Sequence, residues 1–116
     1  DLIYAAPGQS LDEWREDLAR VIALGPDHVS AYNLAFEEET PFARWLDEGR
    51  MQRCDEELEL AFFEATRADL SGAGLEPYEV SNFARYGTQC LHNINYWENG
   101  DYVGIGPSAV SLVGGE

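Results

Sequence analysis

Residues 28–36, which read His-Val-Ser-Ala-Tyr-Asn-Leu-Ala-Phe, decide the fold predicted for this chain. Because successive side chains of a strand point to opposite faces, the odd-numbered and even-numbered residues of this stretch lie on different faces. The even-numbered face carries Ser30, Tyr32, Leu34 and Phe36. Both faces are largely apolar, as expected for a parallel strand covered on both sides. The stretch therefore predicts a buried strand of an α/β protein.

A second strand and a helix precede this stretch. Residues 2–4, Leu-Ile-Tyr, end before a Pro-Gly turn and read as the end of a buried strand. A helix follows, because Ser10 and Glu13 form a capping-box pattern, and a Gly-Pro pair at residues 25–26 ends it. Its apolar stripe consists of Leu11, Trp14, Leu18, Val21 and Ile22. The strand, helix, strand order predicts a right-handed βαβ unit.

Two more helices and further short strands are expected beyond residue 36. Pro41 suits a first helical turn and starts a short helix over residues 42–48. Asp55 caps a longer helix that a pair of glycines terminates. Residues 75–80 and 109–113 read as two short strands. The predicted order is β-α-β-α-α-β, followed by loops and a final strand.

The composition argues against nucleic acid and membrane partners. The 116 residues carry a net charge of −15 at pH 7, and a field of this sign repels phosphate backbones and anionic lipids. No apolar run approaches the roughly 20 residues of a membrane span, and no signal peptide is evident, so a cytoplasmic origin is expected. Cys54 and Cys90 are too far apart for a zinc knuckle and are expected to be free thiols.

Aromatic and polar residues followed by glycines mark the last third of the chain as ligand-facing. Residues 78–85 and 92–97 form two such runs, and glycines follow within residues 103–106. Glycines let a chain pass close to a flat ligand and turn sharply. The glycine-rich run is not a phosphate loop, since no Lys-Ser or Lys-Thr follows it. Composition alone does not identify the ligand.

Five motifs in order give the chain a family resemblance. They are Asp-Leu-Ile-Tyr-Ala-Ala-Pro-Gly-Gln at residues 1–9, Gly-Pro-Asp-His-Val-Ser at 25–30, Thr-Pro-Phe at 40–42, Gly-Leu-Glu-Pro-Tyr-Glu-Val-Ser-Asn-Phe-Ala at 74–84 and His-Asn-Ile-Asn-Tyr-Trp at 92–97. Nearly the whole chain resembles the C-terminal part of a radical S-adenosylmethionine protein of the oxygen-independent coproporphyrinogen III oxidase family. Ala5 stands where that family usually has Gly. The start without Met, inside an apolar run, also indicates a fragment of a larger protein.

The resemblance implies an α/β fold, the C-terminal portion of an incomplete parallel (β/α) barrel. Residues 1–84 would belong to this barrel and residues 85–116 to a post-barrel segment. In such proteins a [4Fe–4S] cluster binds S-adenosylmethionine, which yields a 5′-deoxyadenosyl radical. The cofactors carry the hard chemistry. The family's three-cysteine cluster motif is absent from the sequence given, so we expect no cluster ligands in this segment.

The resemblance also suggests site residues. By position, Asp1, Ala35 and Val110 match residues that line the S-adenosylmethionine site, although Ala35 and Val110 suit a plain core role equally well. For Asp1 the chemistry is sensible, because a carboxylate accepts hydrogen bonds from ribose hydroxyls or an amino group. His92 lies in a His-Asn-x-x-Tyr setting linked to haem binding in the haem-chaperone branch. A neutral imidazole is a good haem ligand, but His92 can equally pin its loop by hydrogen bonds.

The resemblance leaves the activity open between branches. One reading is oxidative decarboxylation of a porphyrinogen propionate to vinyl, which would need an electron donor for the parent protein. The alternative is a haem chaperone that transfers haem without oxidase activity, and a radical methyltransferase relative stays a third reading. Residues 108–111, Ser-Ala-Val-Ser, resemble the oxidase branch, whereas residues 92–97 resemble the chaperone branch. The isolated segment is expected to be inactive and to expose open strand edges.

Overall fold

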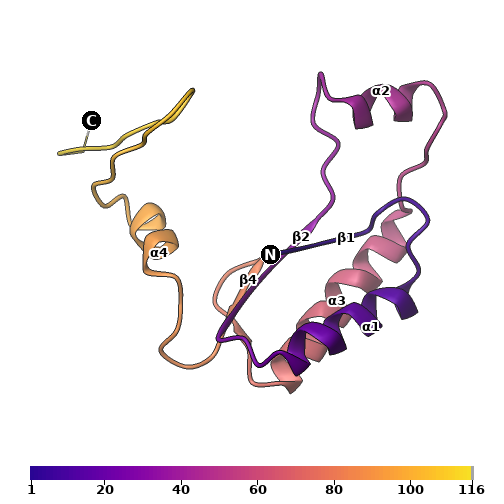
Figure 1. Ribbon diagram of the computed structural model, residues 1–116, viewed down its shortest axis with the longest axis horizontal. Coiled ribbons are helices and arrows are strands. Elements are labelled where there is room, and N and C mark those ends of the chain that lie inside the picture. The colour runs from indigo at the N-terminus through magenta and orange to yellow at the C-terminus, as the bar shows by residue number, and fades with distance from the viewer. Residues whose placement is uncertain (116) are drawn as a thin grey trace.

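A computed structural model describes residues 1–115, so Glu116, the last residue of the expected segment 85–116, lies outside the described residues. Within residues 1–115 there are four short strands and four helices (Figure 1). In chain order they are β1 (Leu2–Tyr4), α1 (Leu11–Ala23), β2 (His28–Asn33), α2 (Pro41–Asp47), α3 (Glu56–Gly72), β3 (Glu76–Pro77), β4 (Asn82–Ala84) and α4 (Leu91–Trp97).

The sheet has the order β1-β2-β4-β3 and is only partly parallel. Strands β1 and β2 run parallel, with Leu2 opposite Ala31, which confirms the βαβ unit. Strands β4 and β3 are antiparallel to their neighbours, so the sheet is parallel only between β1 and β2. The physical reason is the short connection between β3 and β4, which permits a hairpin but is too short for a parallel crossover.

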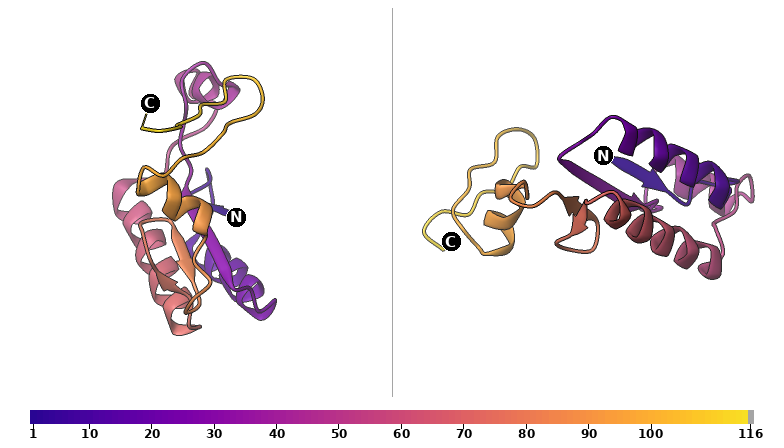
Figure 2. Two further views of the ribbon diagram at one scale, coloured as in Figure 1. Left: turned by 90° about the vertical axis from the view of Figure 1, so that its left-hand side faces the viewer. Right: turned by 90° about the horizontal axis from the view of Figure 1, so that it is seen from below.

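Helices α1 and α3 lie side by side against one face of the sheet (Figures 1 and 2). Their fully buried side chains include Trp14 and Leu18 from α1 and Phe62 and Leu70 from α3. The Trp14 indole Nε1–H donates to Thr66 Oγ1 at 2.9 Å, which satisfies the polar atom of the largest buried side chain. Burial of each large apolar side chain contributes about 1.5–3 kcal/mol, so this layer holds the fold together.

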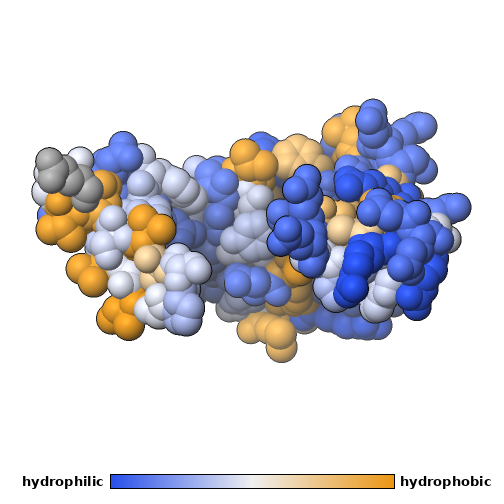
Figure 3. All heavy atoms as spheres, turned by 90° about the horizontal axis from the view of Figure 1, so that it is seen from above, coloured by the Kyte–Doolittle hydropathy of each residue, from blue (hydrophilic) through white to orange (hydrophobic). Residues whose placement is uncertain are grey.

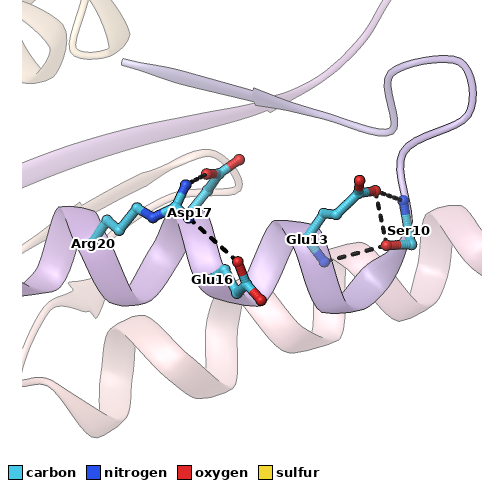
Figure 4. Close-up of polar contacts among 5 residues, drawn as sticks. All are labelled: Ser10, Glu13, Glu16, Asp17 and Arg20. Atoms are coloured by element: carbon cyan, nitrogen blue, oxygen red, sulfur yellow. Dashed lines mark hydrogen bonds and ion pairs between the residues drawn. The ribbon is translucent and has the colours of Figure 1, made fainter.

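The start of α1 is fixed by the predicted capping box (Figure 4). The backbone N–H of Ser10 donates to Glu13 Oε2 at 2.8 Å, and the N–H of Glu13 donates to Ser10 Oγ at 3.3 Å. These hydrogen bonds to Ser10 hold the pKa of Glu13 below its usual value. Farther along α1, Arg20 pairs with exposed Glu16 and Asp17, and such surface pairs contribute little to stability.

Arg85 joins the ends of both packed helices to the sheet. Its Nε donates to the carbonyl of Pro26 at 3.2 Å, beyond α1, and its Nη1 donates to the carbonyl of Ala73 at 3.2 Å, at the C-cap of α3. Its backbone N–H donates to Asp27 O at 3.0 Å. A cation at a helix C-terminus interacts favourably with the helix dipole, so one side chain stabilises two helix ends.

Helix α2 lies on an excursion away from the sheet (Figure 1). Thr40 caps this helix. Pro41 occupies its first turn, as predicted. The Phe42 ring packs against Phe36 and Trp45, with ring centroids 6.4 Å and 5.7 Å apart. These rings pack against one another, although Phe42 remains 41% exposed.

Strand and helix expectations fail mainly after residue 74. The strand predicted over residues 75–80 shrinks to two residues, and β4 is a strand that no prediction covered. Residues 109–113 form no strand, and Leu112 makes only an isolated bridge with Tyr102. Helix α4 replaces an expected loop. These elements depend on partners distant in sequence, whereas the correctly predicted helices carry local caps and an apolar stripe.

The surface differs between the two ends of the molecule. In Figure 3 hydrophilic groups dominate the end formed by the packed helices, and apolar groups stand out at the end formed by the C-terminal segment. The exposed apolar residues of that segment are Val103, Ile105, Val110 and Val113. Among the described residues, no helix combines the length and apolarity that crossing a bilayer requires.

Candidate functional site

The open face of the sheet, opposite α1 and α3, carries polar side chains. The core side of β2 is formed by Val29 and Ala31, so the alternate residues Ser30 and Tyr32 lie on the open face. Ser30 pairs with Asn82 of β4 across the antiparallel ladder. A buried polar pair in the middle of a small sheet is unusual enough to mark a candidate site.

Two neighbouring cavities open along this face. The β2 cavity has a volume of about 420 Å³ and is lined by Asp1, His28, Ser30, Tyr32, Thr88, Cys90 and Asn93. The α4 cavity has a volume of about 430 Å³ and is lined by Tyr32, Glu79, Ser81, Asn82, His92, Asn93, Tyr96 and Trp97. Tyr32 and Asn93 line both cavities, so the cavities share a wall.

A hydrogen-bond relay runs from half-buried Glu79 through buried Asn82 to buried Ser30. Glu79 Oε1 accepts from the backbone N–H of Ser81 at 2.7 Å and from the Asn82 amide Nδ2. The Ser30 hydroxyl donates to Asn82 Oδ1 at 2.6 Å. Ser30 and Asn82 are only 5% and 4% exposed, so water does not compete for these bonds.

Tyr78 connects the sheet to the start of α4. Its hydroxyl lies 2.6 Å from His28 Nε2 on β2 and accepts from the backbone N–H of Cys90 at 3.3 Å. Burial lowers the pKa of His28. A lowered pKa favours the neutral imidazole, which can accept a hydrogen bond from the Tyr78 hydroxyl.

Helix α4 presents His92 and Tyr96 on one face, one turn apart. Their ring centroids lie 5.2 Å apart in an edge-to-face arrangement, and Tyr96 stacks on Tyr102 at 3.9 Å. The hydrogen bond with Tyr102 raises the pKa of Tyr96, and burial and the Tyr102 charge add to the rise. His92 is exposed and offers its imidazole to the α4 cavity, which Tyr96 also lines.

Comparisons with known proteins identify the relatives of this chain, although no family model matches it. The heme chaperone HemW of Mycobacterium tuberculosis strain H37Rv is 40% identical over 98% of this chain. The mitochondrial radical S-adenosyl methionine domain-containing protein 1 of Bos taurus is 38% identical over 94% of it. The solved structure of coproporphyrinogen III oxidase (HemN) from Escherichia coli, described as a radical SAM enzyme, superposes on 98% of the chain with a TM-score of 0.73 and 24% identity.

This chain is similar, over nearly its whole length, to a segment of HemW and of the radical S-adenosyl methionine domain-containing protein 1. It spans only 29% of the HemW relative and 29% of the HemN chain. The family resemblance of the sequence motifs is thereby confirmed. The superposition with HemN also confirms the fold class, an α/β radical SAM fold whose sheet is here partly parallel.

The structure brings only some of the expected site residues of this radical SAM segment together. Asp1 lines the β2 cavity and His92 lines the neighbouring α4 cavity. Ala35 is exposed and lies just beyond the end of β2, and Val110 is 66% exposed in the C-terminal segment. Neither of these two lines the β2 or α4 cavity, and neither is buried as a plain core residue would be. A cluster of three or more metal-ligating side chains is absent from residues 1–115.

The polar residues of the relay were missed in the sequence. Ser30 was placed on the correct face of its strand, but its partner Asn82 belongs to the unpredicted strand β4. The available signal was the polar side chain at a central position of an otherwise apolar strand, since a buried hydroxyl needs a hydrogen-bond partner. Cys54 and Cys90 are free cysteines, as expected.

Proposed function

We propose that the parent protein of this segment is a radical S-adenosylmethionine protein of the haem-chaperone type, which binds and transfers haem. Identities of 33–40% to HemW proteins of several bacteria, over at least 91% of this chain, support this choice over the oxidase branch. The observation that carries the proposal is the α4 cavity, where His92 lies beside aromatic side chains. In this proposal residues 1–84 belong to the barrel. Residues 85–116 form a post-barrel segment, which contains the proposed haem ligand His92.

The residues of the α4 cavity suit a tetrapyrrole. A flat apolar ring system is best met by aromatic side chains, and Tyr32, Tyr96 and Trp97 line this cavity. Haem iron takes a histidine nitrogen as axial ligand. His92 supplies the imidazole among the residues that line this cavity, so we assign to it the role of haem-iron ligand.

The residues of the β2 cavity suit the polar end of S-adenosylmethionine. Asp1 and Ser30 both offer oxygen atoms that can accept hydrogen bonds from an amino group or from ribose hydroxyls. Ala35 and Val110 would contact the same cofactor only through parts of it that extend beyond this cavity. When bound to a [4Fe–4S] cluster held by residues outside this chain, S-adenosylmethionine would supply radical chemistry.

A haem titration of the full-length protein tests the proposal. We expect the parent protein to bind haem with a Soret band shifted from that of free haem, and His92→Ala to weaken binding at least tenfold and to alter the band. The chain offers a matched control, because His28 is its only other histidine. His28→Gln should leave the Soret band unchanged. Equal haem binding and equal spectra for the parent and His92→Ala would refute His92 as the ligand.

A second candidate function is oxidative decarboxylation of a porphyrinogen. It is supported by the superposition on the coproporphyrinogen III oxidase HemN and by the oxidase-like residues 108–111. Anaerobic incubation of the full-length protein with S-adenosylmethionine, a chemical electron donor and coproporphyrinogen III separates the two. Haem binding without formation of vinyl product favours the chaperone, whereas vinyl product and carbon dioxide in stoichiometric amounts favour the oxidase.

A further inference from the structure

We propose that Glu79, acting through Asn82, fixes the Ser30 hydroxyl as a hydrogen-bond acceptor toward the β2 cavity. The cavity then selects ligand groups that donate hydrogen bonds, such as an ammonium or a hydroxyl, over carboxylates and phosphates. Glu79 and Asn82 are positioning residues in this arrangement, and Ser30 is the residue that meets the ligand. The inference rests on the proposed function, in which S-adenosylmethionine is that ligand.

The direction of the relay begins at Glu79. An ionised carboxylate has acceptor oxygens and no proton to donate. Its Oε1 accepts from two neighbours, the backbone N–H of Ser81 and the side-chain amide of Asn82. The partner on Asn82 must therefore be its NH₂ group. The flipped amide would set a carbonyl oxygen against the carboxylate oxygen, which is repulsive in a buried setting.

The amide then determines the direction at Ser30. With its NH₂ group held by Glu79, Asn82 turns Oδ1 toward the Ser30 hydroxyl, 2.6 Å away. Two oxygens at this distance need a proton between them, and only the hydroxyl can supply it. Both side chains are at least nine-tenths buried, so no water offers an alternative arrangement. The hydroxyl proton of Ser30 is therefore engaged in the hydrogen bond to Asn82 and cannot be donated to a ligand.

The Ser30 hydroxyl oxygen can therefore only accept hydrogen bonds from groups in the β2 cavity. A hydroxyl oxygen has two acceptor lone pairs, and the relay leaves them for the cavity that Ser30 lines. Asp1 lines the same cavity and adds a second acceptor of negative charge. Thr88 adds no proton, because its hydroxyl donates to the carbonyl of Asp27 at 2.7 Å. A ligand ammonium or hydroxyl meets complementary atoms here, and an anionic group meets repulsion.

Calorimetric binding of S-adenosylmethionine to the anaerobically purified full-length protein tests the inference. We expect Ser30→Ala to weaken binding about tenfold and Glu79→Gln about threefold, the range for one lost hydrogen bond and one weakened hydrogen bond. Ser30→Thr retains the hydroxyl and should bind as the parent does. Ser71→Ala is the control, since it removes a hydroxyl of α3 that does not line the β2 cavity, and the affinity of this variant should stay within about twofold.

Ligand analogues separate hydrogen bonding from mere disturbance of the fold. One analogue replaces the α-amino group with hydrogen, and two others lack the ribose 2′- or 3′-hydroxyl. The loss caused by Ser30→Ala should disappear for the analogue that lacks the donor facing Ser30 and persist for the others. An equal loss for every analogue, or no loss for S-adenosylmethionine itself, overturns the inference.

Thermal unfolding without ligand tests the relay independently of the proposed binding of S-adenosylmethionine. Glu79 and Ser30 share no direct hydrogen bond and are joined only by Asn82. If the relay exists, the shift in thermal midpoint of Glu79→Gln with Ser30→Ala should be smaller than the sum of the single shifts. Additive shifts refute the relay. A parent protein that shows this coupling but binds no S-adenosylmethionine refutes the proposed cofactor and leaves the orientation of Ser30 supported.

Discussion

The layer formed by β1, α1, β2 and α3 and the segment 91–115 differ in how they are held. Helix α1 buries Trp14 and Leu18 and begins with a complete capping box, whereas α4 buries no side chain and its N-cap residue Cys90 makes no side-chain hydrogen bond. The first region is stabilised by its own core. The second has a defined conformation because it is attached to the sheet, and this is the region that carries His92.

Tyr78 provides much of that attachment. Its hydroxyl contacts His28 on β2 and the Cys90 N–H at the start of α4, and its ring lies 5.8 Å from the Trp97 ring at the end of α4. A few polar and aromatic contacts thus position the candidate binding surface on a scaffold that has a hydrophobic core of its own.

The largest expected loss of unfolding free energy comes from a substitution in the core of the first region. Phe62→Ala removes a fully buried ring that packs 6.1 Å from Tyr4, and we expect a loss of about 3–5 kcal/mol in unfolding free energy. Urea unfolding of the full-length protein measures it. Ile105→Ala in the second region, where the side chain is 93% exposed, should cost less than about 0.5 kcal/mol. Similar costs for both variants would contradict the comparison.

A smaller effect concerns the buried indole bond between the two packed helices. Trp14→Phe removes the Nε1–H donor and part of the ring, and we expect a loss of about 2 kcal/mol. Thr66 keeps its own donation to Phe62 O at 2.7 Å, so no buried hydroxyl proton is left without a partner. A double-mutant cycle with Thr66→Val in urea unfolding should reveal coupling, and additive costs would argue against the hydrogen bond.

Helix starts give a direct test of the difference between the regions. Ser10→Ala removes the hydroxyl that accepts from the Glu13 N–H and donates to Glu13 Oε2, which should cost about 1 kcal/mol. Cys90→Ala at the start of α4 should change stability by less than about 0.5 kcal/mol, because no side-chain cap is present. Both values come from urea midpoints at constant m. The comparison is wrong if Cys90→Ala proves the more costly substitution.

The smallest effect is a pH dependence at the junction of the regions. The folded-state pKa of His28 lies below its ordinary value of 6.5, so the unfolded chain binds its proton more readily. Stability from this group is present above pH 6.5 and is lost as the pH falls from there through the folded-state pKa. His28 is partly exposed, so we expect at most about 0.5 kcal/mol. His28→Gln should lose less stability than the parent between pH 7.5 and 5.5 in thermal melts, and an equal loss would exclude His28 as the origin.

Local signals explain which parts of the fold were predictable. The start of α1, the cap of α3 by Asp55 and the start of α2 at Pro41 each follow from residues within one helical turn. Strand β4 has only three residues, and it is a strand because it pairs with His28, Val29 and Ser30, more than fifty positions earlier. Helix α4 contains two asparagines, lacks a side-chain cap and buries nothing, so neither propensity nor periodicity marks it.

The candidate site was predictable only where local sequence motifs mark its residues. Asp1 and His92 follow from motif positions, and each lines a cavity of the open face. The relay through Asn82 depends on the register of β2 against β4, and pairing between distant segments is not encoded locally. The roles of Ala35 and Val110 in binding S-adenosylmethionine remain predictions, because neither residue lines the β2 cavity or the α4 cavity.

Ala5, which stands where the family usually has Gly, has a backbone φ of +60° and is 3% exposed. An L-residue in this left-handed conformation costs about 1–2 kcal/mol, which glycine avoids. The tolerance of this position to mutation is therefore one-sided. Reversion to Gly relieves the backbone at the loss of one methyl group, whereas valine or isoleucine would combine the most unfavourable backbone for a branched side chain with a site that has no room for it. Further sequence change at this strand end is restricted to smaller side chains.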